Sequence, residues 1–180
     1  MADFRGKKVL VTGSNGFVGA HLMARLMAQG AEVTGLVRSS SDHWRFDALE
    51  ITPQVLTCDL DDKVKLDALL NHWGAEYVFH LAAERDRGKL GLADAQERSA
   101  CSGVNVMQAI ASERLARFIS VGSSLEVPDT VSGQPSGLHG KSKARELQAL
   151  RTLAETLNLP YSPTRTHYVY GPLQAAGKLV

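Results

Sequence analysis

The sequence predicts an α/β fold in which helices cover both faces of a doubly wound parallel sheet. Short apolar segments alternate with longer amphipathic segments along the chain, which is the pattern of strands connected by helices. The first apolar segment ends in a turn with three glycines spaced three residues apart, and polar or small residues follow the later strands. In a parallel sheet these strand ends meet at one edge, where ligands bind.

The composition is that of a globular domain and excludes several classes of function. The 180 residues are 44% hydrophobic and 22% charged, and the net charge of +1 gives no expectation of a nucleic-acid or membrane-surface partner. Without an apolar run long enough for a signal peptide or a bilayer span, a cytoplasmic protein is expected. Cys58 and Cys101 lack metal-ligand spacing, so reduced cysteines and no metal site are expected.

Six apolar or β-branched segments bounded by turn residues are predicted to be strands. In chain order they are Lys7–Thr12, Glu32–Val37, Val55–Cys58, Glu76–Leu81, Arg117–Val121 and Ser162–His167. The last segment is polar and contains Pro163, which indicates an edge strand.

The intervening segments carry apolar residues at helical spacing. The predicted helices are about Gly16–Gln29, Trp44–Leu49, a helix beginning at Lys63, Ala93–Glu113 and Leu138–Leu157. The side chains expected to face the sheet are Val18, Leu22 and Leu26, then Leu66, Leu69, Leu70 and Trp73, then Val104, Met107, Ile110 and Ala111, and finally Leu147, Leu150, Ala154 and Leu157.

The glycine-rich turn after the first strand is the clearest functional signal. Gly13 permits a tight turn, Gly16 lets the backbone approach a pyrophosphate, and Gly19 lets the helix pack closely on the strand. The N–H groups at the start of the helix then face the anion. We therefore predict a Rossmann-type dinucleotide site. Its expected residues in this turn are Gly13, Ser14, Asn15, Gly16, Phe17, Val18 and Gly19.

The end of the second strand is where such a fold selects its cofactor. An acidic residue there would hold the ribose 2′-OH of NAD, whereas an arginine accommodates the 2′-phosphate of NADP. Here the strand ends at Val37 and continues into Arg38 and Ser39. We predict NADP as the cofactor, with NAD as the alternative if Arg38 is an ordinary solvated residue.

Short motifs follow the later strands in a familiar order. They are Asp59-Leu60, His80-Leu81-Ala82-Ala83, Val121-Gly122-Ser123-Ser124, Pro135 to Lys143, and Val169-Tyr170-Gly171-Pro172. With the glycine-rich turn, they make nearly the whole chain resemble the extended short-chain dehydrogenase/reductases, in particular the NAD(P)-dependent epimerase/dehydratase group that acts on nucleotide sugars.

The resemblance implies further cofactor contacts. Asp59 would accept a hydrogen bond from the adenine amino group, and Leu60 would flank the ring. The remaining residues that would line the dinucleotide are Leu81, Ala82, Ala83, Val121 and Lys143.

The resemblance also assigns catalytic roles, with one departure. The family pattern Pro-x-x-x-Tyr-Gly-x-Ser-Lys is matched from Pro135 to Lys143, except that the tyrosine is His139. Ser124 would bind the reacting oxygen, His139 would transfer the proton, and Lys143 would hold the nicotinamide ribose. Histidine titrates near neutral pH and can act as an acid or base. The other interpretations are that the family chemistry is lost, or that Tyr168 or Tyr170 is the acid.

We therefore expect an enzyme that transfers a hydride between NAD(P) and a nucleotide sugar or a related hydroxy or keto substrate. The alternative is a non-catalytic NAD(P)-binding module with a structural or sensing role. The NAD(P)-binding domain is expected to span residues 1–172, with 173–180 beginning the C-terminal substrate region of the family. The resemblance also implies a homodimer.

Overall fold

A computed structural model describes residues 3–71, 73–83, 92–112 and 114–175 of the chain. Its strands are β1 (Lys8–Thr12), β2 (Glu32–Val37), β3 (Gln54–Thr57), β4 (Tyr77–His80), β5 (Arg117–Ser123) and β6 (Tyr161–Thr166). Its helices are α1 (Phe17–Ala28), α2 (Trp44–Ala48), α3 (Lys63–Leu70), α4 (Leu92–Ala109) and α5 (Gly137–Thr156), with a 3-10 turn η1 (Ser124–Glu126).

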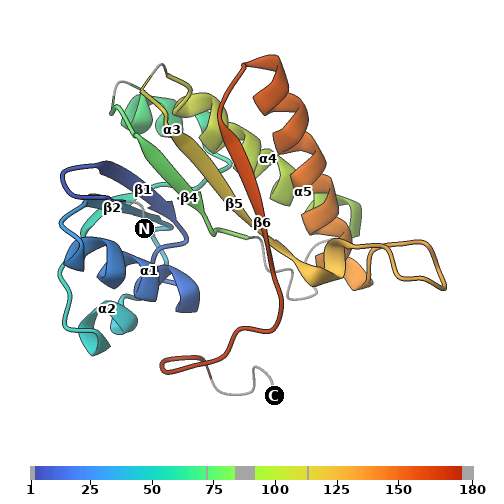
Figure 1. The fold of residues 1–180 in the computed structure, drawn as a ribbon, viewed down its shortest axis with the longest axis horizontal. Helices are drawn as coiled ribbons and strands as arrows, with labels where there is room; N and C mark the ends of the chain where they lie inside the picture. Colours follow the sequence, from blue (N-terminus) through green and yellow to red (C-terminus); the bar gives the residue numbers. More distant parts are fainter. Residues whose placement is uncertain (1–2, 72, 84–91, 113, 176–180) are drawn as a thin grey trace.

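The strands form one parallel sheet in the order β3-β2-β1-β4-β5-β6. The chain moves outward from β1 to β3, then crosses back to add β4 on the other side of β1. Figure 1 shows α1 and α2 on one face of the sheet and α3, α4 and α5 on the other. This is the predicted doubly wound fold, and its reversal point between β1 and β4 is where such sheets bind ligands.

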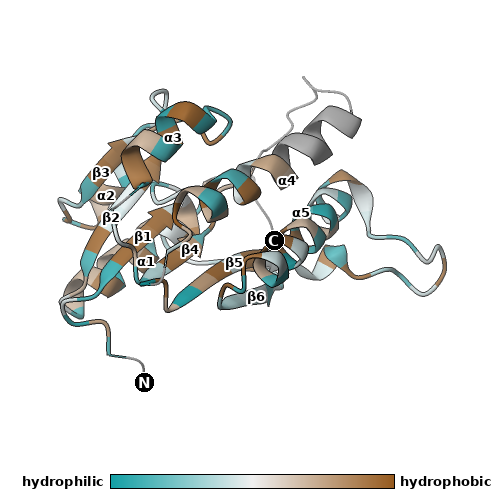
Figure 2. Cartoon of the chain, turned by 90° about the horizontal axis from the view of Figure 1, so that it is seen from above, coloured by the Kyte–Doolittle hydropathy of each residue, from teal (hydrophilic) through white to brown (hydrophobic). Residues whose placement is uncertain are grey.

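Two apolar clusters, one on each face of the sheet, form the core. Successive strand residues point to opposite faces, so Leu10 of β1 packs in one cluster while Val9 and Val11 pack in the other. The first cluster includes Leu66, Met107 and Leu150 from α3, α4 and α5, and the second includes Met23 and Phe46 from α1 and α2. Apolar residues accordingly lie along the strands and the inner faces of the helices in Figure 2.

Several details of the sequence prediction are wrong. Val18, Ala111 and Leu157 are exposed, although each was expected to face the sheet. In α1 the small residues Gly19 and Ala20 are buried, and Val18 lies on the exposed side of the helix.

Ala111 and Leu157 fall outside the regular helices. Ala111 follows α4, which ends at Ala109 and not at Glu113, and Leu157 is the C-cap of α5. Strand β5 continues to Ser123, beyond the predicted Val121, because Gly122 and Ser123 still pair with β6.

Candidate active site

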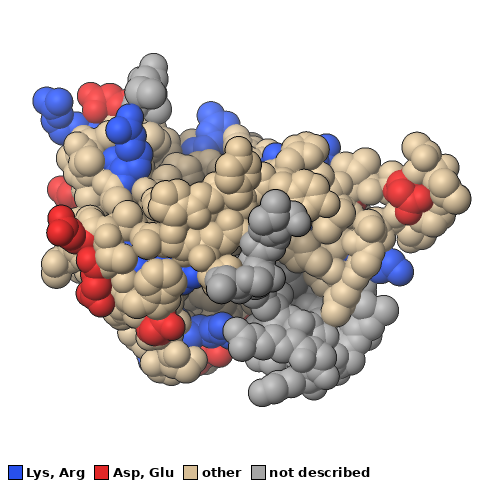
Figure 3. Space-filling model, turned by 90° about the horizontal axis from the view of Figure 1, so that it is seen from below, with Lys and Arg blue, Asp and Glu red and all other residues tan. Residues whose placement is uncertain are grey.

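A cavity of about 720 Å³ lies at the carboxyl ends of the strands. Figure 3 views the molecule from this side and shows Lys and Arg side chains beside its hollowed part. Many of the residues predicted from the sequence line the cavity: Gly13, Asn15, Gly16, Phe17, Arg38, Asp59, Leu60, Leu81, Ala82, Ala83 and His139. The other predicted residues, all in the described part of the chain, do not line it: Ser14, Val18, Gly19, Ser39, Val121, Ser124 and Lys143.

The glycine-rich turn is packed too tightly for side chains at two positions. Gly13 has φ of +65°, and a Cβ there would lie 2.8 Å from the backbone nitrogen of Ala82. A Cβ at Gly19 would overlap the carbonyl oxygen of Gly13. The turn predicted from the glycine spacing is therefore present, and it brings the start of α1 against the end of β1.

The N-terminus of α1 is open to an anion. Among the described residues no side chain caps the helix at Gly16, and its first turn contains no acidic residue. The first N–H groups of a helix lack partners within it and carry partial positive charge. Because Asn15, Gly16 and Phe17 line the cavity, the helix can bind phosphate oxygens there.

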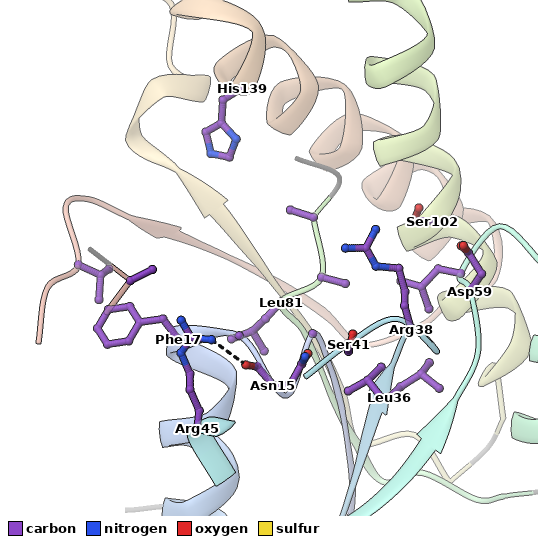
Figure 4. Close-up of a pocket in the computed structure, with 18 of the residues that line it drawn as sticks. Asn15, Phe17, Leu36, Arg38, Ser41, Arg45, Asp59, Leu81, Ser102 and His139 are labelled. Atoms are coloured by element: carbon purple, nitrogen blue, oxygen red, sulfur yellow. Dashed lines mark hydrogen bonds between the residues drawn. The ribbon is translucent and has the colours of Figure 1, made fainter. Parts of the chain in front are cut away.

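One end of the cavity has the groups expected for a nucleoside. Figure 4 shows the side chains of Arg38, Asp59 and Ser102 at this end, with Leu36 and Ser41 below them. Asp59 follows β3, and its Oδ1 accepts a hydrogen bond from the backbone N–H of Asp61 at 3.1 Å. This contact holds a carboxylate at the end of the cavity that Arg38 also lines.

His139 lies at the other end of the cavity, in the first turn of α5 (Figure 4). A Cβ at Gly140 would overlap the carbonyl oxygen of Leu125, and the N–H of Ser136 donates to the same oxygen at 2.9 Å. The start of α5 is thus held against η1, which begins at Ser124. The packing brings Ser124 and His139 to the same end of the sheet.

Ser124 is held by a feature that the sequence analysis missed. Ser123 and Glu126 form a capping box, in which the N–H of Ser123 donates to Oε2 of Glu126 at 3.1 Å. The Nε of Arg165 donates to Oε1 of the same buried carboxylate at 3.0 Å. The Ser-x-x-Glu pattern was present in the sequence as a signal for this turn.

Part of the segment after β6, residues 167–175, also lines the cavity, namely His167, Tyr168, Val169, Gln174 and Ala175. Tyr168, one of the two alternative acids, is therefore at the cavity, whereas Tyr170 does not line it, and no role was predicted for Gln174 and Ala175. The Nε of Arg45 donates to the carbonyl oxygen of Leu173 at 3.0 Å, and its Nη1 donates to that of Asn15 at 3.3 Å (Figure 4). His21 contacts the carbonyl oxygen of Pro172 at 2.9 Å. Arg45 therefore joins the glycine-rich turn to the C-terminal segment, and no local pattern in the sequence indicated this role.

Lys143 is buried and does not line the cavity, and its Nζ donates to Oε2 of Glu146 at 2.7 Å. Oε1 of Glu146 lies 3.1 Å from Nε2 of His80. Burial alone would raise the pKa of the Glu146 carboxyl, but the contact with His80 and the charge of Lys143 outweigh burial and lower it. The carboxylate is therefore ionised at neutral pH.

Residues 9–180 match the sequence model of the NAD dependent epimerase/dehydratase family. The chain belongs to this family. Within the part of the epimerase/dehydratase chain that the structure describes, no metal-binding cluster occurs and no helix is long and apolar enough to cross a membrane.

Individual relatives are distant. Fatty acid hydroxylase uhd1 of Mycosarcoma maydis is 27% identical over 186 residues, which cover 93% of this chain and 61% of that protein. A putative epimerase from Burkholderia cenocepacia J2315 has a similar structure, with a TM-score of 0.80 and 22% identity over 98% of this chain and 59% of that one.

A further structure is DesIV of Streptomyces venezuelae, a dTDP-glucose 4,6-dehydratase with NAD and TYD bound. It gives a TM-score of 0.80 and 24% identity over 96% of this chain and 59% of that one. The two structures confirm the Rossmann fold of the epimerase/dehydratase chain. The chain spans about three fifths of the length of all three relatives.

Proposed function

We propose that the protein binds NADP in the cavity and uses it for hydride transfer on a nucleotide sugar or a related hydroxy or keto compound. The observation that carries the proposal is the arrangement of the groups lining the cavity, from Arg38 and Asp59, past the open N-terminus of α1, to His139. This order suits an adenosine, a pyrophosphate and a reactive ring.

The residues of the cavity fit a dinucleotide. The carboxylate of Asp59 can accept a hydrogen bond from an exocyclic amine, and the helix N-terminus suits the pyrophosphate. Arg38 can pair with the 2′-phosphate that distinguishes NADP from NAD, since a guanidinium matches phosphate geometry. Gly13 lets the turn pack against Ala82, another residue that lines the cavity, because any side chain there would clash with the backbone of Ala82.

His139 is proposed to move the proton that accompanies the hydride. When bound, the nicotinamide ring supplies the acceptor or donor of the hydride. Neutral His139 accepts the proton of a substrate hydroxyl during oxidation, and protonated His139 returns it to a carbonyl oxygen during reduction. In the roles that the family pattern gives them, the hydroxyl of Ser124 donates a hydrogen bond to that oxygen and Lys143 holds the nicotinamide ribose, although neither residue lines the cavity in the structure.

The substrate class rests on family membership and on relatives such as the dTDP-glucose 4,6-dehydratase DesIV. Conversion would be measured by chromatography after incubation with UDP-, dTDP- and GDP-hexoses and NADP. We expect one of them to be converted, and His139→Ala to lower the rate at least about 100-fold, as for loss of a general acid or base.

The alternative is a non-catalytic NAD(P)-binding module, which the replacement of the family tyrosine by His139 favours. Fluorescence titration with NADPH and NADH separates the two. Cofactor binding without turnover, together with gain of activity in His139→Tyr, would establish the module. Failure to bind either cofactor would contradict both functions.

A further inference from the structure

Lys143 belongs to a buried chain of polar contacts that crosses from α5 to the two central strands. Its amine contacts Glu146 at 2.7 Å, and Glu146 lies 3.1 Å from His80 of β4. Nδ1 of His80 is 2.8 Å from the hydroxyl of Thr12, the last residue of β1. That hydroxyl accepts a hydrogen bond from the N–H of Ala82 at 3.2 Å. This series of polar contacts therefore ends at the backbone of Ala82, which lines the cavity.

The side chains that make these polar contacts are closed to solvent. The side chains of His80, Glu146 and Lys143 are 0%, 4% and 7% exposed. Gly103 of α4 closes one side, because a Cβ there would lie 3.3 Å from both Nε2 of His80 and Oε1 of Glu146. Interactions between charges are stronger in such an environment than in water, and an unpaired charge there is costly.

The contacts hold the His80 ring between Glu146 and Thr12. An ionised carboxylate can only accept hydrogen bonds, so the ring nitrogen beside Glu146, Nε2, carries the hydrogen. On the other side of the ring, Nδ1 lies within hydrogen-bond distance of the Thr12 hydroxyl. Among the described residues Nε2 has no aligned hydrogen-bond partner, so its attraction to Glu146 at 3.1 Å is mainly electrostatic.

We propose that Glu146 is a positioning residue: with His80 and Thr12 it fixes the ammonium group of Lys143 relative to the cofactor cavity. The proposal rests on the proposed function, in which Lys143 holds the nicotinamide ribose. Lys143 has three N–H donors, and one is used by Glu146. Glu146 thus orients the ammonium group and compensates its charge, and two donors remain for the ribose of a bound cofactor.

Binding of NADPH tests the proposal in the whole chain. Glu146→Gln keeps the shape of the side chain and removes its charge. We expect it to raise the Kd for NADPH about tenfold, which corresponds to about 1.4 kcal/mol. Lys143→Met should also raise this Kd. Adding Glu146→Gln to Lys143→Met should change the Kd no further. Unchanged affinity in the single variant, or fully additive effects in the double variant, would overturn the proposal.

Leu150→Ala is the matched control for a general loss of packing. Leu150 is buried on α5 one turn beyond Glu146, and it does not belong to the polar chain. Leu150→Ala should lower the Tm by at least as much as Glu146→Gln does. Its Kd for NADPH should stay within about twofold of the wild-type value. If the Kd of the variants follows the Tm, Glu146 has only a structural role. Should Glu146→Gln not fold, His80→Phe gives the same test, with a smaller rise in Kd expected.

An NMR measurement separates this proposal from the proposed function. In cofactor-free protein labelled with 15N-lysine, the ammonium signal of Lys143 is identified by its loss in Lys143→Met. In the wild type this ammonium signal should be shielded from exchange with water. It should move or broaden in Glu146→Gln and His80→Phe, and it should be unchanged in Leu150→Ala. If wild-type protein binds no dinucleotide, the proposed function fails, and this signal still decides whether Glu146 fixes the amine. An unaltered signal in Glu146→Gln would overturn the positioning.

Discussion

Gly140 and Leu125 are packed so closely that a methyl group at Gly140 would overlap the carbonyl oxygen of Leu125. The contact joins α5 to η1 next to His139 and Ser124, the residues proposed to handle the proton and the reacting oxygen. The glycine that follows His139 is therefore required by packing between two elements.

Gly140→Ala should destabilise the protein. Alanine favours a helix by up to about 1 kcal/mol over glycine, but overpacking costs about 1–3 kcal/mol and here meets a backbone atom that cannot rotate away. We expect a net loss in the free energy of unfolding, measured by urea denaturation, and slower turnover. Arg145→Ala, at an exposed position of the same helix, should change stability by less than about 0.5 kcal/mol. A Gly140→Ala protein as stable as the wild type would show that α5 and η1 separate freely.

Arg38→Ala should reduce the preference for NADPH over NADH. A hydrogen bond to a charged group contributes about 1.5–3 kcal/mol, so the Kd for NADPH should rise about 10- to 100-fold. The Kd for NADH should change little, because NADH lacks the 2′-phosphate. Fluorescence titration measures both constants, and Arg151→Ala, exposed on α5, controls for lost positive charge. Equal losses for both cofactors would refute Arg38 as the 2′-phosphate ligand.

Local patterns in the sequence predicted the fold well because strand identity depends on neighbouring residues. Strand β2 was predicted with its observed bounds, Glu32–Val37, since it lies between a helix-ending glycine and a polar turn. The orientation of α1 was wrong at Val18. Hydrophobicity favoured placing that residue inside, whereas close packing of the helix on the turn backbone at Gly13 and Ser14 required the glycine at position 19 to be the buried residue.

The candidate site was predictable where it consists of strand ends. Gly13, Asp59 and Ala82 end or follow parallel strands, and the topology brings them to one cavity. Contacts between distant elements left no such signal. Arg45 lies 128 residues before its partner Leu173. His80 was named only as part of the motif after the fourth strand and Glu146 was not singled out, because their contact arises only when the fold brings β4 and α5 together.

Arg45→Lys should loosen the C-terminal segment, residues 167–175, while keeping the charge. A lysine amine cannot reproduce the two directed bonds that the guanidinium makes to Asn15 and Leu173. If the segment helps to retain the cofactor, NADPH should dissociate about tenfold faster, since each lost bond contributes about 1 kcal/mol. Stopped-flow fluorescence measures this rate. Arg25→Ala, exposed on α1, should leave the rate unchanged. An unaltered rate in Arg45→Lys would show that the segment does not retain the cofactor.

Acid should weaken the attachment of β1 to β4 through Glu76. This carboxylate accepts hydrogen bonds from Nζ of Lys7 at 2.9 Å and from the backbone N–H of Lys8 at 3.0 Å, and these contacts lower its pKa. A lowered pKa in the folded state means that the unfolded state binds protons first as the pH falls. The stability from Glu76 is therefore fully present above about pH 5 and is lost as the pH drops below about 4.3 toward the folded pKa.

Thermal unfolding between neutral and acidic pH tests this contribution. Glu76→Gln should have a lower Tm than wild type at neutral pH, and the difference should shrink as the pH falls, because protonated Glu76 loses the same charge. Glu32→Gln, exposed at the start of β2, should show no such convergence. Parallel Tm curves for wild type and Glu76→Gln at all pH values would show that the ionised carboxylate of Glu76 does not stabilise the fold.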